Sequence, residues 1–228
     1  MNDEKEKQAE QEEEKPQKKD STLFLVSILI IIGIVAGIII WRIAIPTGKV
    51  TTIDDLHALN LKGKLSEDKG YIYNGFSFIF YDGMWYTQSR VGNTLLNVPM
   101  HFGPRDLENI TVKGKINDRF KQKRIYITFD PEDPNMQYLA LSASELSLFL
   151  ALGLDLEPKA ACTKNITEAC ANRPILDCSN KKKAIIYLNQ DNETAVELKG
   201  NCVEVKGDKM NLVRAVDRLI LKWLGVMP

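Results

Sequence analysis

The sequence predicts an α+β domain that follows a single transmembrane helix, with mixed or antiparallel strands, two main helices and two disulfides. The transmembrane helix is predicted by residues 23–41, LFLVSILIIIGIVAGIIIW, which contain no charged side chain. The α+β class is predicted by hairpin signals that begin at residue 71 and by only two long helical patterns in residues 70–228. Strands that occur in groups with few helices are typical of α+β domains, whereas a regular alternation predicts βαβ units.

The apolar run is long enough to cross a bilayer. Nineteen residues of helix, at about 1.5 Å of rise each, nearly match a hydrocarbon layer of roughly 30 Å. We therefore expect a transmembrane signal anchor at residues 22–45, preceded by a disordered cytoplasmic tail at residues 1–21. The first twenty residues hold eight acidic side chains and five lysines, with almost no apolar residue. Within the anchor, the spacing of Gly33 and Gly37 permits two helices to approach closely in a homodimer.

Basic residues near the apolar run predict its orientation. Lys15, Lys18 and Lys19 precede the run, whereas Arg42 and Lys49 follow it. Because cytoplasmic flanks carry the excess of lysine and arginine, we expect a cytoplasmic N-terminus and an extracytoplasmic C-terminal domain, as in a type II single-pass protein of the cell membrane. The alternatives that remain open are a cleaved signal peptide, a pilin-like subunit and a domain that faces the cytoplasm.

The folded domain is expected at residues 70–228, after a linker at residues 46–69 that contains a short helical stretch. Two hairpin turns open the domain, at Asn74-Gly75 and at Asp82-Gly83, because these dipeptides supply the positive φ angles of tight turns. They connect strands at residues 71–73, 76–81 and 84–87. On the middle strand Phe76, Phe78 and Phe80 share one face, which we expect to be buried.

The remaining elements are predicted by periodicity and end signals. Further strands are expected at residues 95–102, 110–116, 125–129, 175–178, 184–188, 195–198 and 202–205. Ser142 and Glu145 fit a capping box at the start of a helix that Gly153 ends. A second, amphipathic helix has one apolar face and ends at Gly225. The apolar face consists of Leu212, Val216, Leu219, Ile220 and Trp223, and the other side of Arg214, Asp217, Arg218 and Lys222.

The four cysteines indicate an oxidising compartment. Their even number, without any Cys-x-x-Cys pair, is typical of two disulfides rather than of a structural zinc site. We favour Cys162 with Cys170, which closes a short polar loop, and Cys178 with Cys202, which joins two predicted strands. Spacing alone leaves the other pairings open.

Sites of N-glycosylation are also predicted on the side expected to lie outside. The sequons begin at Asn109, Asn165 and Asn192. Asn165 lies between two cysteines and Asn192 follows a polar cluster, so both are expected at the surface. Asn109 precedes a predicted strand and is the weakest of the three candidates.

Eight aromatic residues crowd into residues 71–86. If they are exposed, Tyr73, Tyr81 and Trp85 are candidates for a surface that binds a sugar or a partner protein, since aromatic rings provide a large contact area. The alternative, which we favour, is a hairpin sheet with one buried aromatic face.

His101, Arg105 and Asp106 form the most motif-like loop. They bring an imidazole, a guanidinium and a carboxylate within six residues, and a histidine can act as a general acid or base. This loop is the candidate centre of an alternative function, a membrane-tethered hydrolase. The structural interpretation, which we favour, is that Pro104 begins a short helix and Asp106 lies in its first turn.

No cofactor, metal or nucleic acid is expected as a partner. With only two histidines in the chain, a site of three histidines cannot form. The acidic loop at residues 130–135 offers oxygen ligands for calcium, but it lacks the glycine and the ligand spacing of an EF-hand and predicts a solvated turn. After the first twenty residues the chain has 25 basic and 22 acidic side chains, which is too balanced to attract polyanions strongly.

Two segments, VPMHFGPRDLENI at residues 98–110 and NCVEVKGDKMNLVRAVDRLILKWLGVM at residues 201–227, resemble a family of uncharacterised single-pass membrane proteins from small-genome archaea. In that family, too, an anchor precedes a domain with aromatic hairpins, spaced cysteines and a closing Asp-Arg-Leu helix. The resemblance covers most of residues 23–228. It implies the architecture and an envelope location, and it implies no activity, substrate or catalytic residue.

Together these features predict a membrane-anchored binding, envelope-assembly or sensor module that is not an enzyme. Its expected partners are the lipid bilayer and an envelope protein or a surface polymer.

Overall fold

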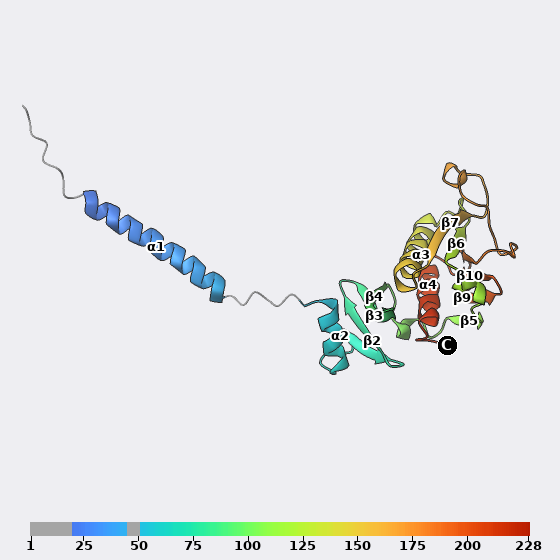
Figure 1. Cartoon of the computed structure of the whole chain (residues 1–228), viewed down its shortest axis with the longest axis horizontal. Helices are drawn as coiled ribbons and strands as arrows, with labels where there is room; N and C mark the ends of the chain where they lie inside the picture. The colour runs from blue at the N-terminus through green and yellow to red at the C-terminus, as the bar shows by residue number, and fades with distance from the viewer. Residues whose placement is uncertain (1–19, 45–50) are drawn as a thin grey trace, which may run out of the picture. The chain divides into compact units, whose positions relative to one another are not determined.

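The computed structural model describes residues 20–44 and 51–228, with the side chains of residues 24–38 in the first range. The chain divides into two compact units, Met1–Val50 and Thr51–Pro228, and we describe each unit by itself. Residues 1–19 of the expected tail and residues 45–50 lie outside the described residues. Figure 1 shows the order of the elements along the chain.

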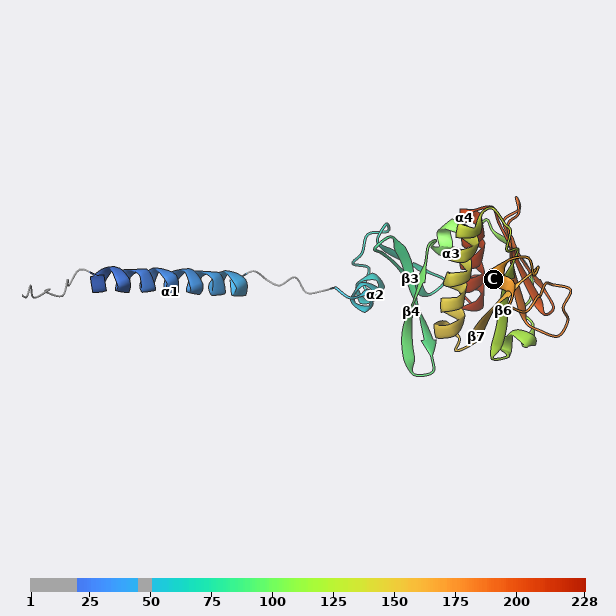
Figure 2. The ribbon, with the colours of Figure 1, turned by 90° about the horizontal axis from the view of Figure 1, so that it is seen from above.

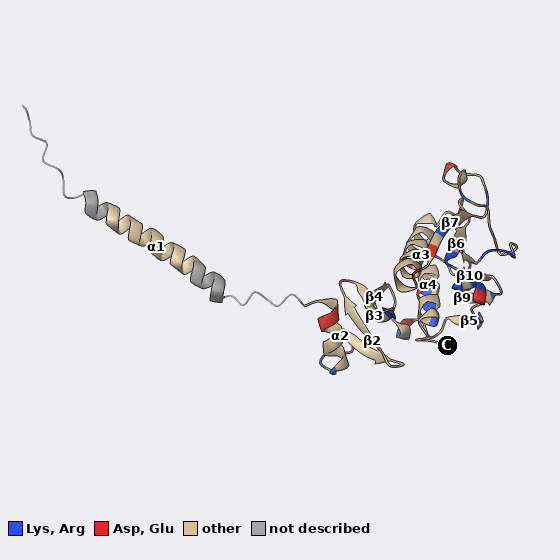
Figure 3. Cartoon of the chain, in the orientation of Figure 1, with Lys and Arg blue, Asp and Glu red and all other residues tan. Residues whose placement is uncertain are grey.

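The described part of the first unit is the helix α1 (Asp20–Ala44). Its 25 residues correspond to a length of about 37 Å. The large apolar side chains of residues 24–38 are exposed on every side of the helix, for example Phe24 at 67% and Ile31 at 59%. This described stretch of α1 carries no charge (Figure 3). A helix that is apolar all round is typical of a protein core or of a membrane span.

The second unit begins with α2 (Ile53–Leu61), which starts with a capping box of Thr52 and Asp55. Asn60 of α2 is buried, and its Nδ2 lies 2.8 Å from Ser77 Oγ and 3.0 Å from the carbonyl oxygens of Tyr71 and Phe78. The linker expected at residues 46–69 is therefore wrong for residues 51–69, because α2 belongs to the folded unit.

The first sheet is an antiparallel meander in the order β1-β2-β3-β4. Its strands are β1 (Gly70–Tyr73), β2 (Phe76–Tyr81), β3 (Met84–Val91) and β4 (Thr94–Met100). The two predicted turns are confirmed, since Asn74, Gly75, Asp82 and Gly83 all have positive φ angles. A third turn at Gly92, with φ +58°, was not predicted; it makes β3 longer than expected, and β4 ends two residues before the expected limit.

The aromatic face of β2 packs as predicted. Phe78 is fully buried in the main core, and Phe76 packs against that core. Phe80 contacts Trp85 of β3, with ring centroids 5.3 Å apart. The opposite face of the meander carries Ser77, which contacts α2.

The second sheet has six strands in the order β5-β9-β10-β8-β6-β7. Its strands are β5 (Thr111–Gly114), β6 (Arg124–Phe129), β7 (Glu157–Cys162), β8 (Ile185–Asn189), β9 (Ala195–Lys199) and β10 (Cys202–Lys206). The strands β10, β8, β6 and β7 are parallel, and β9 is antiparallel to β10. The sheet is therefore mixed, and the α+β class is confirmed.

Two expectations about this sheet need correction. The sequence EPKAAC of β7 was not predicted as a strand, because it lacks β-branched residues and contains Pro158. An edge strand tolerates a proline, since one side of its backbone has no strand to pair with. The strand expected at residues 175–178 is reduced to one bridge between Ile175 and Cys162.

Two helices cover one face of the second sheet and lie side by side (Figure 2). They are α3 (Met136–Leu148), which continues into a π-helical turn at Phe149–Gly153, and α4 (Met210–Trp223). Three short 3-10 helices complete the unit, at Pro104–Asp106, Asp118–Lys121 and Glu168–Cys170. The apolar face of α4 is buried as predicted, and Gly225 after it has a positive φ.

The predicted start of α3 is wrong. The helix begins seven residues earlier, after Asn135, and Ser142 is a fully buried residue in its middle rather than a cap. The stretch Met136–Gly153 is also the one candidate membrane span by length and composition in the described part of the chain, and a third of it is buried. Leu139, Leu146 and Leu150 belong to the core, so this segment is a core helix. The apolar stretch Phe24–Ile38 of α1 is shorter.

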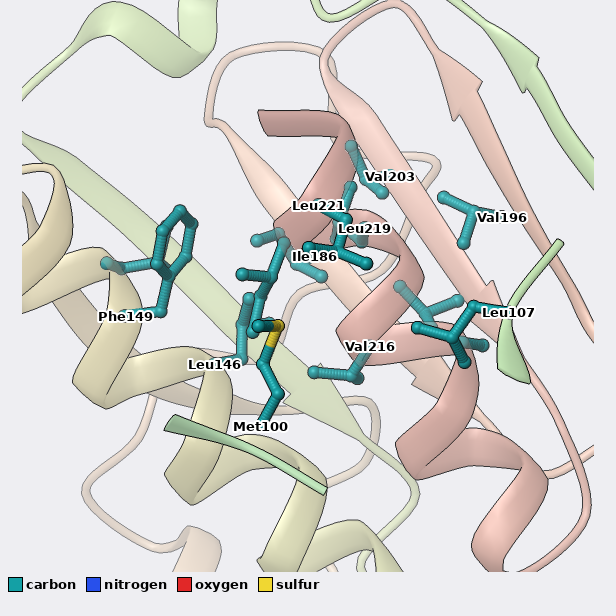
Figure 4. Close-up of a cluster of buried hydrophobic side chains, with 14 of the residues drawn as sticks. Met100, Leu107, Leu146, Phe149, Ile186, Val196, Val203, Val216, Leu219 and Leu221 are labelled. Carbon is teal, nitrogen blue, oxygen red and sulfur yellow. The ribbon is translucent and has the colours of Figure 1, made fainter. Parts of the chain in front are cut away.

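The main core lies between these helices and the second sheet, and it extends to the meander. Figure 4 shows Met100 from β4 close to Leu146 of α3, and Ile186 and Val203 of the sheet near Leu219 of α4. The opposite face of the second sheet holds a smaller buried cluster of Ala161, Leu176, Ile185 and Cys202.

Both favoured disulfides are present. Cys162 is bonded to Cys170 with Cα atoms 6.0 Å apart, and Cys178 is bonded to Cys202 with Cα atoms 5.3 Å apart. Cys178 lies in a loop rather than in the strand expected there. The two bonds attach the loop between β7 and β8 to the sheet.

Replacing Asn60 with alanine should destabilise the second unit by about 2 kcal/mol, because the buried carbonyl oxygens of Tyr71 and Phe78 lose their donor. Thermal unfolding of the full chain in detergent measures the effect. Leu61→Ala is the control, since Leu61 is the next residue and is 63% exposed. Equal unfolding temperatures of the two variants would contradict the docking of α2.

Candidate functional site

A cavity of about 260 Å³ lies between β4 and the C-terminal part of α3. On one side it is lined by Leu96, Asn97, Val98 and Pro99 of β4. On the other side it is lined by Glu145, Leu148, Phe149 and Leu152, and Ile53 of α2 and Tyr86 of β3 complete the wall. We call this cavity and the adjacent edge of β4 the strand–helix groove.

The groove lies at the outer edge of the meander. β4 is the last strand of that sheet, and side chains from both of its faces line the cavity. Pro99 lies opposite Tyr86 of β3 and has no backbone N–H to donate. The two residues therefore form a non-hydrogen-bonded pair of the antiparallel ladder. Because such pairs alternate along the strand, the backbone N–H and C=O groups of Leu95 and Asn97 point away from β3, toward this edge.

Besides Tyr86, the polar side chains in the wall are Asn97 and Glu145, and both are bonded within the domain. Asn97 Nδ2 donates to Asp54 Oδ1 at 3.0 Å, and Asn97 Oδ1 accepts from Gln88 Nε2 at 3.3 Å. Glu145 Oε1 lies 3.0 Å from Nδ1 of His101 and accepts from the backbone N–H of the same residue at 3.2 Å. The groove therefore offers a ligand mainly apolar contacts, and Leu148 and Leu152 in its wall are 48% and 59% exposed.

Behind the groove, the carboxyl group of Glu145 interacts with a second carboxyl group, that of Asp217 of α4. Asp217 is completely buried, and its Oδ2 accepts from the backbone N–H of Phe102 at 2.9 Å. Glu145 Oε2 and Asp217 Oδ1 have no hydrogen-bond partner of their own among the described residues, so each is satisfied best when the pair carries a proton. Two neighbouring buried carboxyl groups oppose each other's ionisation, because their like charges repel.

Burial is the main cause of the altered acidity of this carboxyl pair. It raises the pKa of Glu145, and hydrogen bonding to His101 offsets part of that change. Burial and then the negative charge of Glu145 raise the pKa of Asp217 well above its ordinary value. The pair joins the end of β4 to both α3 and α4.

The residues of the predicted hydrolase centre are not brought together. His101 contacts Glu145, whereas Arg105 Nη1 binds Glu67 at 3.2 Å and its guanidinium lies 4.1 Å from the ring centroid of Tyr71. Asp106 is exposed, and its carbonyl oxygen accepts from the guanidinium of Arg214. Pro104 begins a 3-10 helix that includes Asp106, as the structural interpretation predicted.

The three candidate aromatic residues do not form one surface. Trp85 packs against Tyr71, with ring centroids 4.9 Å apart, and Tyr73 packs partly buried against the main core. Tyr81 belongs to the opposite face of the meander and is 48% exposed. The interpretation of a buried aromatic face accounts for Tyr73 and Trp85.

The sequon asparagines Asn109, Asn165 and Asn192 are all exposed. Asn165 lies in the loop that the Cys162–Cys170 bond closes.

In the acidic loop at residues 130–135, the carboxylate oxygen Oδ2 of Asp130 forms an ion pair with Lys164 Nζ at 2.7 Å. Across residues 20–44 and 51–228, no three His, Cys, Asp or Glu side chains are grouped to hold a metal ion.

Sequence reasoning missed the carboxyl pair. It assigned Glu145 to a capping box and Asp217 to the solvated side of the second helix. Asp217 is separated by four residues from both Val213 and Leu221, so it lies within an apolar stripe of α4. An acidic residue in that position is a signal of burial that the sequence contained.

The chain matches no family model, no curated protein and no solved structure. The resemblance to archaeal single-pass membrane proteins therefore stays a prediction.

The raised pKa values of Glu145 and Asp217 predict an unusual dependence of stability on pH. The folded unit keeps a proton that the unfolded chain releases near about pH 4. The resulting stabilisation is complete below the unfolded-state pKa values of Glu145 and Asp217, and it is lost as the pH rises through their raised folded-state values.

Asp217→Asn should flatten this dependence and should not lower stability at neutral pH, because an amide can accept from Phe102 N–H and donate to Glu145. Urea unfolding of the full chain in detergent at a series of pH values measures the slope. Asp106→Asn, which alters an exposed carboxylate, is the control. An unchanged slope in Asp217→Asn would contradict the shared proton.

Proposed function

We propose that this chain is a membrane-anchored binding module whose domain stands on the extracytoplasmic side of the cell membrane. The all-round apolar surface of α1 supports the anchor, because such a helix is stable in a hydrocarbon layer. The lysines before the apolar run support a cytoplasmic N-terminus. The two disulfides support an oxidising compartment for the domain.

The proposed ligand of the strand–helix groove is an extended segment of a partner envelope protein. The observation that carries this proposal is the coincidence of an unpaired strand edge with an apolar cavity. An extended peptide can pair with the backbone groups of Leu95 and Asn97 as an added strand, and it can place one apolar side chain in the cavity. The main-chain hydrogen bonds supply affinity, and the cavity selects the side chain.

Binding is favoured over hydrolysis because His101, Arg105 and Asp106 make separate contacts. The carboxyl pair has a structural task, since it receives the backbone N–H groups that follow β4. For the anchor we also propose self-association: a Cβ atom at Gly33 or Gly37 would meet no other part of the described chain within 4 Å, beyond the adjacent backbone of the helix itself, so the space beside both glycines is open to a second copy.

The membrane topology is tested by the cysteines. In right-side-out membrane vesicles, a membrane-impermeant maleimide should label the chain only after treatment with a membrane-impermeant reductant, because all four cysteines are paired and outside. A Gln8→Cys variant is the control and should gain label only after the vesicles are permeabilised. Labelling of the native cysteines without reductant, or only after permeabilisation, would contradict the proposed location.

The groove is tested with peptides selected for binding to the full chain in nanodiscs. Binding should slow hydrogen exchange at the amides of Leu95 and Asn97. Leu152→Lys should weaken the selected peptides by about tenfold or more, because one apolar contact is replaced by a charge. Leu61→Lys, on an exposed position of α2 outside the cavity wall, is the matched control. Equal affinity of both variants would reject the groove.

A further inference from the structure

A second hollow, of about 330 Å³, lies on the face of the six-stranded sheet opposite α3 and α4. Its basic residues are Arg124 of β6, Lys159 of β7 and Lys183, which precedes β8. Tyr126 of β6 forms part of its floor. We call this site the basic hollow; it lies apart from the strand–helix groove and does not depend on the function proposed for that groove.

The register of the sheet brings these side chains together. Because β6 and β7 are parallel, Tyr126 pairs with Lys159 and Arg124 pairs with Glu157. The Nζ of Lys183 lies 4.6 Å from the centroid of the Tyr126 ring. The ammonium group of Lys183 therefore lies over the aromatic ring, and Lys159 is the neighbour of Tyr126 on the adjacent strand.

The opposite wall of the hollow is held in place covalently. Asn172 and Pro174 form this wall, and they lie between two half-cystines, Cys170 and Cys178. The carbonyl oxygen of Pro174 also accepts from the backbone N–H of Cys162 at 3.1 Å. Both disulfides thus fix the loop that faces the cations, which reduces the entropy that a ligand would lose in ordering the site.

The position of Lys183 is fixed as well. Asn201 Nδ2 donates to its carbonyl oxygen at 2.9 Å, and the guanidinium of Arg119 donates to the carbonyl oxygen of Lys182 at 3.0 Å. These bonds hold the backbone before β8 against the sheet. The backbone that carries Lys183, like the loop of Asn172 and Pro174, is therefore held in place before a ligand binds.

Charge balance indicates the class of ligand. Arg124 forms an ion pair with Glu157, in which Nη2 of the arginine lies 3.7 Å from Oε2 of the glutamate. Lys159 and Lys183 have no ion-pair partner among the residues that the structure describes. The hollow therefore carries two positive charges that no carboxylate neutralises. A phosphate ester carries a charge of about −1.5 to −2 at neutral pH and three acceptor oxygens.

We propose that the basic hollow binds a phosphate or sulfate group, with Lys159 and Lys183 as its charge partners and Arg124 and the amide of Asn172 as further donors. Cation-assisted hydrogen bonds to such oxygens are stronger than neutral ones. The phosphate can belong to a soluble ester or to a lipid headgroup, and the experiment separates these two sources.

The test uses the full chain in nanodiscs of zwitterionic lipid, titrated calorimetrically with inorganic phosphate at constant ionic strength. We expect saturable binding of phosphate and of sulfate, and weaker binding of acetate, which has a single charge. Lys159→Gln with Lys183→Gln should weaken phosphate binding by at least about tenfold. Lys181→Gln with Lys182→Gln removes the same charge from the adjacent turn and should change it by less than about twofold.

The outcomes distinguish specific binding of phosphate at the basic hollow from nonspecific electrostatic attraction to surface lysines. Equal weakening in the two double variants, or no saturable binding in the parent chain, would overturn the proposal. Thermal unfolding of both double variants checks that they fold like the parent. Nanodiscs that contain phosphatidic acid distinguish the sources: competition with inorganic phosphate at the hollow indicates a lipid headgroup, and unchanged phosphate affinity indicates a soluble ester.

Discussion

The architecture of the domain depends on two buried carboxyl groups that receive the end of β4. Asp217 accepts from the N–H of Phe102, and Glu145 accepts from the N–H of His101. A buried carboxyl group is costly unless it is hydrogen-bonded or protonated, and each member of this pair meets that need only while β4, α3 and α4 stay together. The pair therefore connects the meander to the helices that cover the second sheet.

This junction produces the strand–helix groove. It draws the end of β4 toward α3 at Glu145, and Leu148 and Leu152 follow on the same side of the cavity. Asp54 supports the opposite side, because it accepts from both Gln88 and Asn97 and so holds the start of α2 against the β3–β4 hairpin. The groove is thus built from long-range contacts between elements, which makes its shape a property of the folded unit and not of one segment.

The basic hollow depends on a different constraint, the two disulfides on the other face of the sheet. Cysteine spacing favoured both bonds but left the other pairings open, and the folded chain decides among them. The paired turns at Asn74-Gly75 and Asp82-Gly83 and the apolar face of α4 were predictable because they depend on neighbouring residues. β7 was not, because its sequence has no strand propensity and its place at the edge of a parallel sheet is decided by β6. The start of α3 was also missed, since the core contacts of Met136 and Leu139 outweigh the capping signal at Ser142.

The sequence by itself determined the apolar helix, the hairpin turns and the α+β class, because turn dihedrals and side-chain periodicity are set by neighbouring residues. Only the tertiary structure decided the sites. His101 meets Glu145 across 44 positions and Phe102 meets Asp217 across 115 positions, so no local pattern could pair them. The same long-range packing separated Arg105 and Asp106 from His101, and it turned two acidic side chains that a sequence pattern assigns to caps and solvent into the buried joint of the domain.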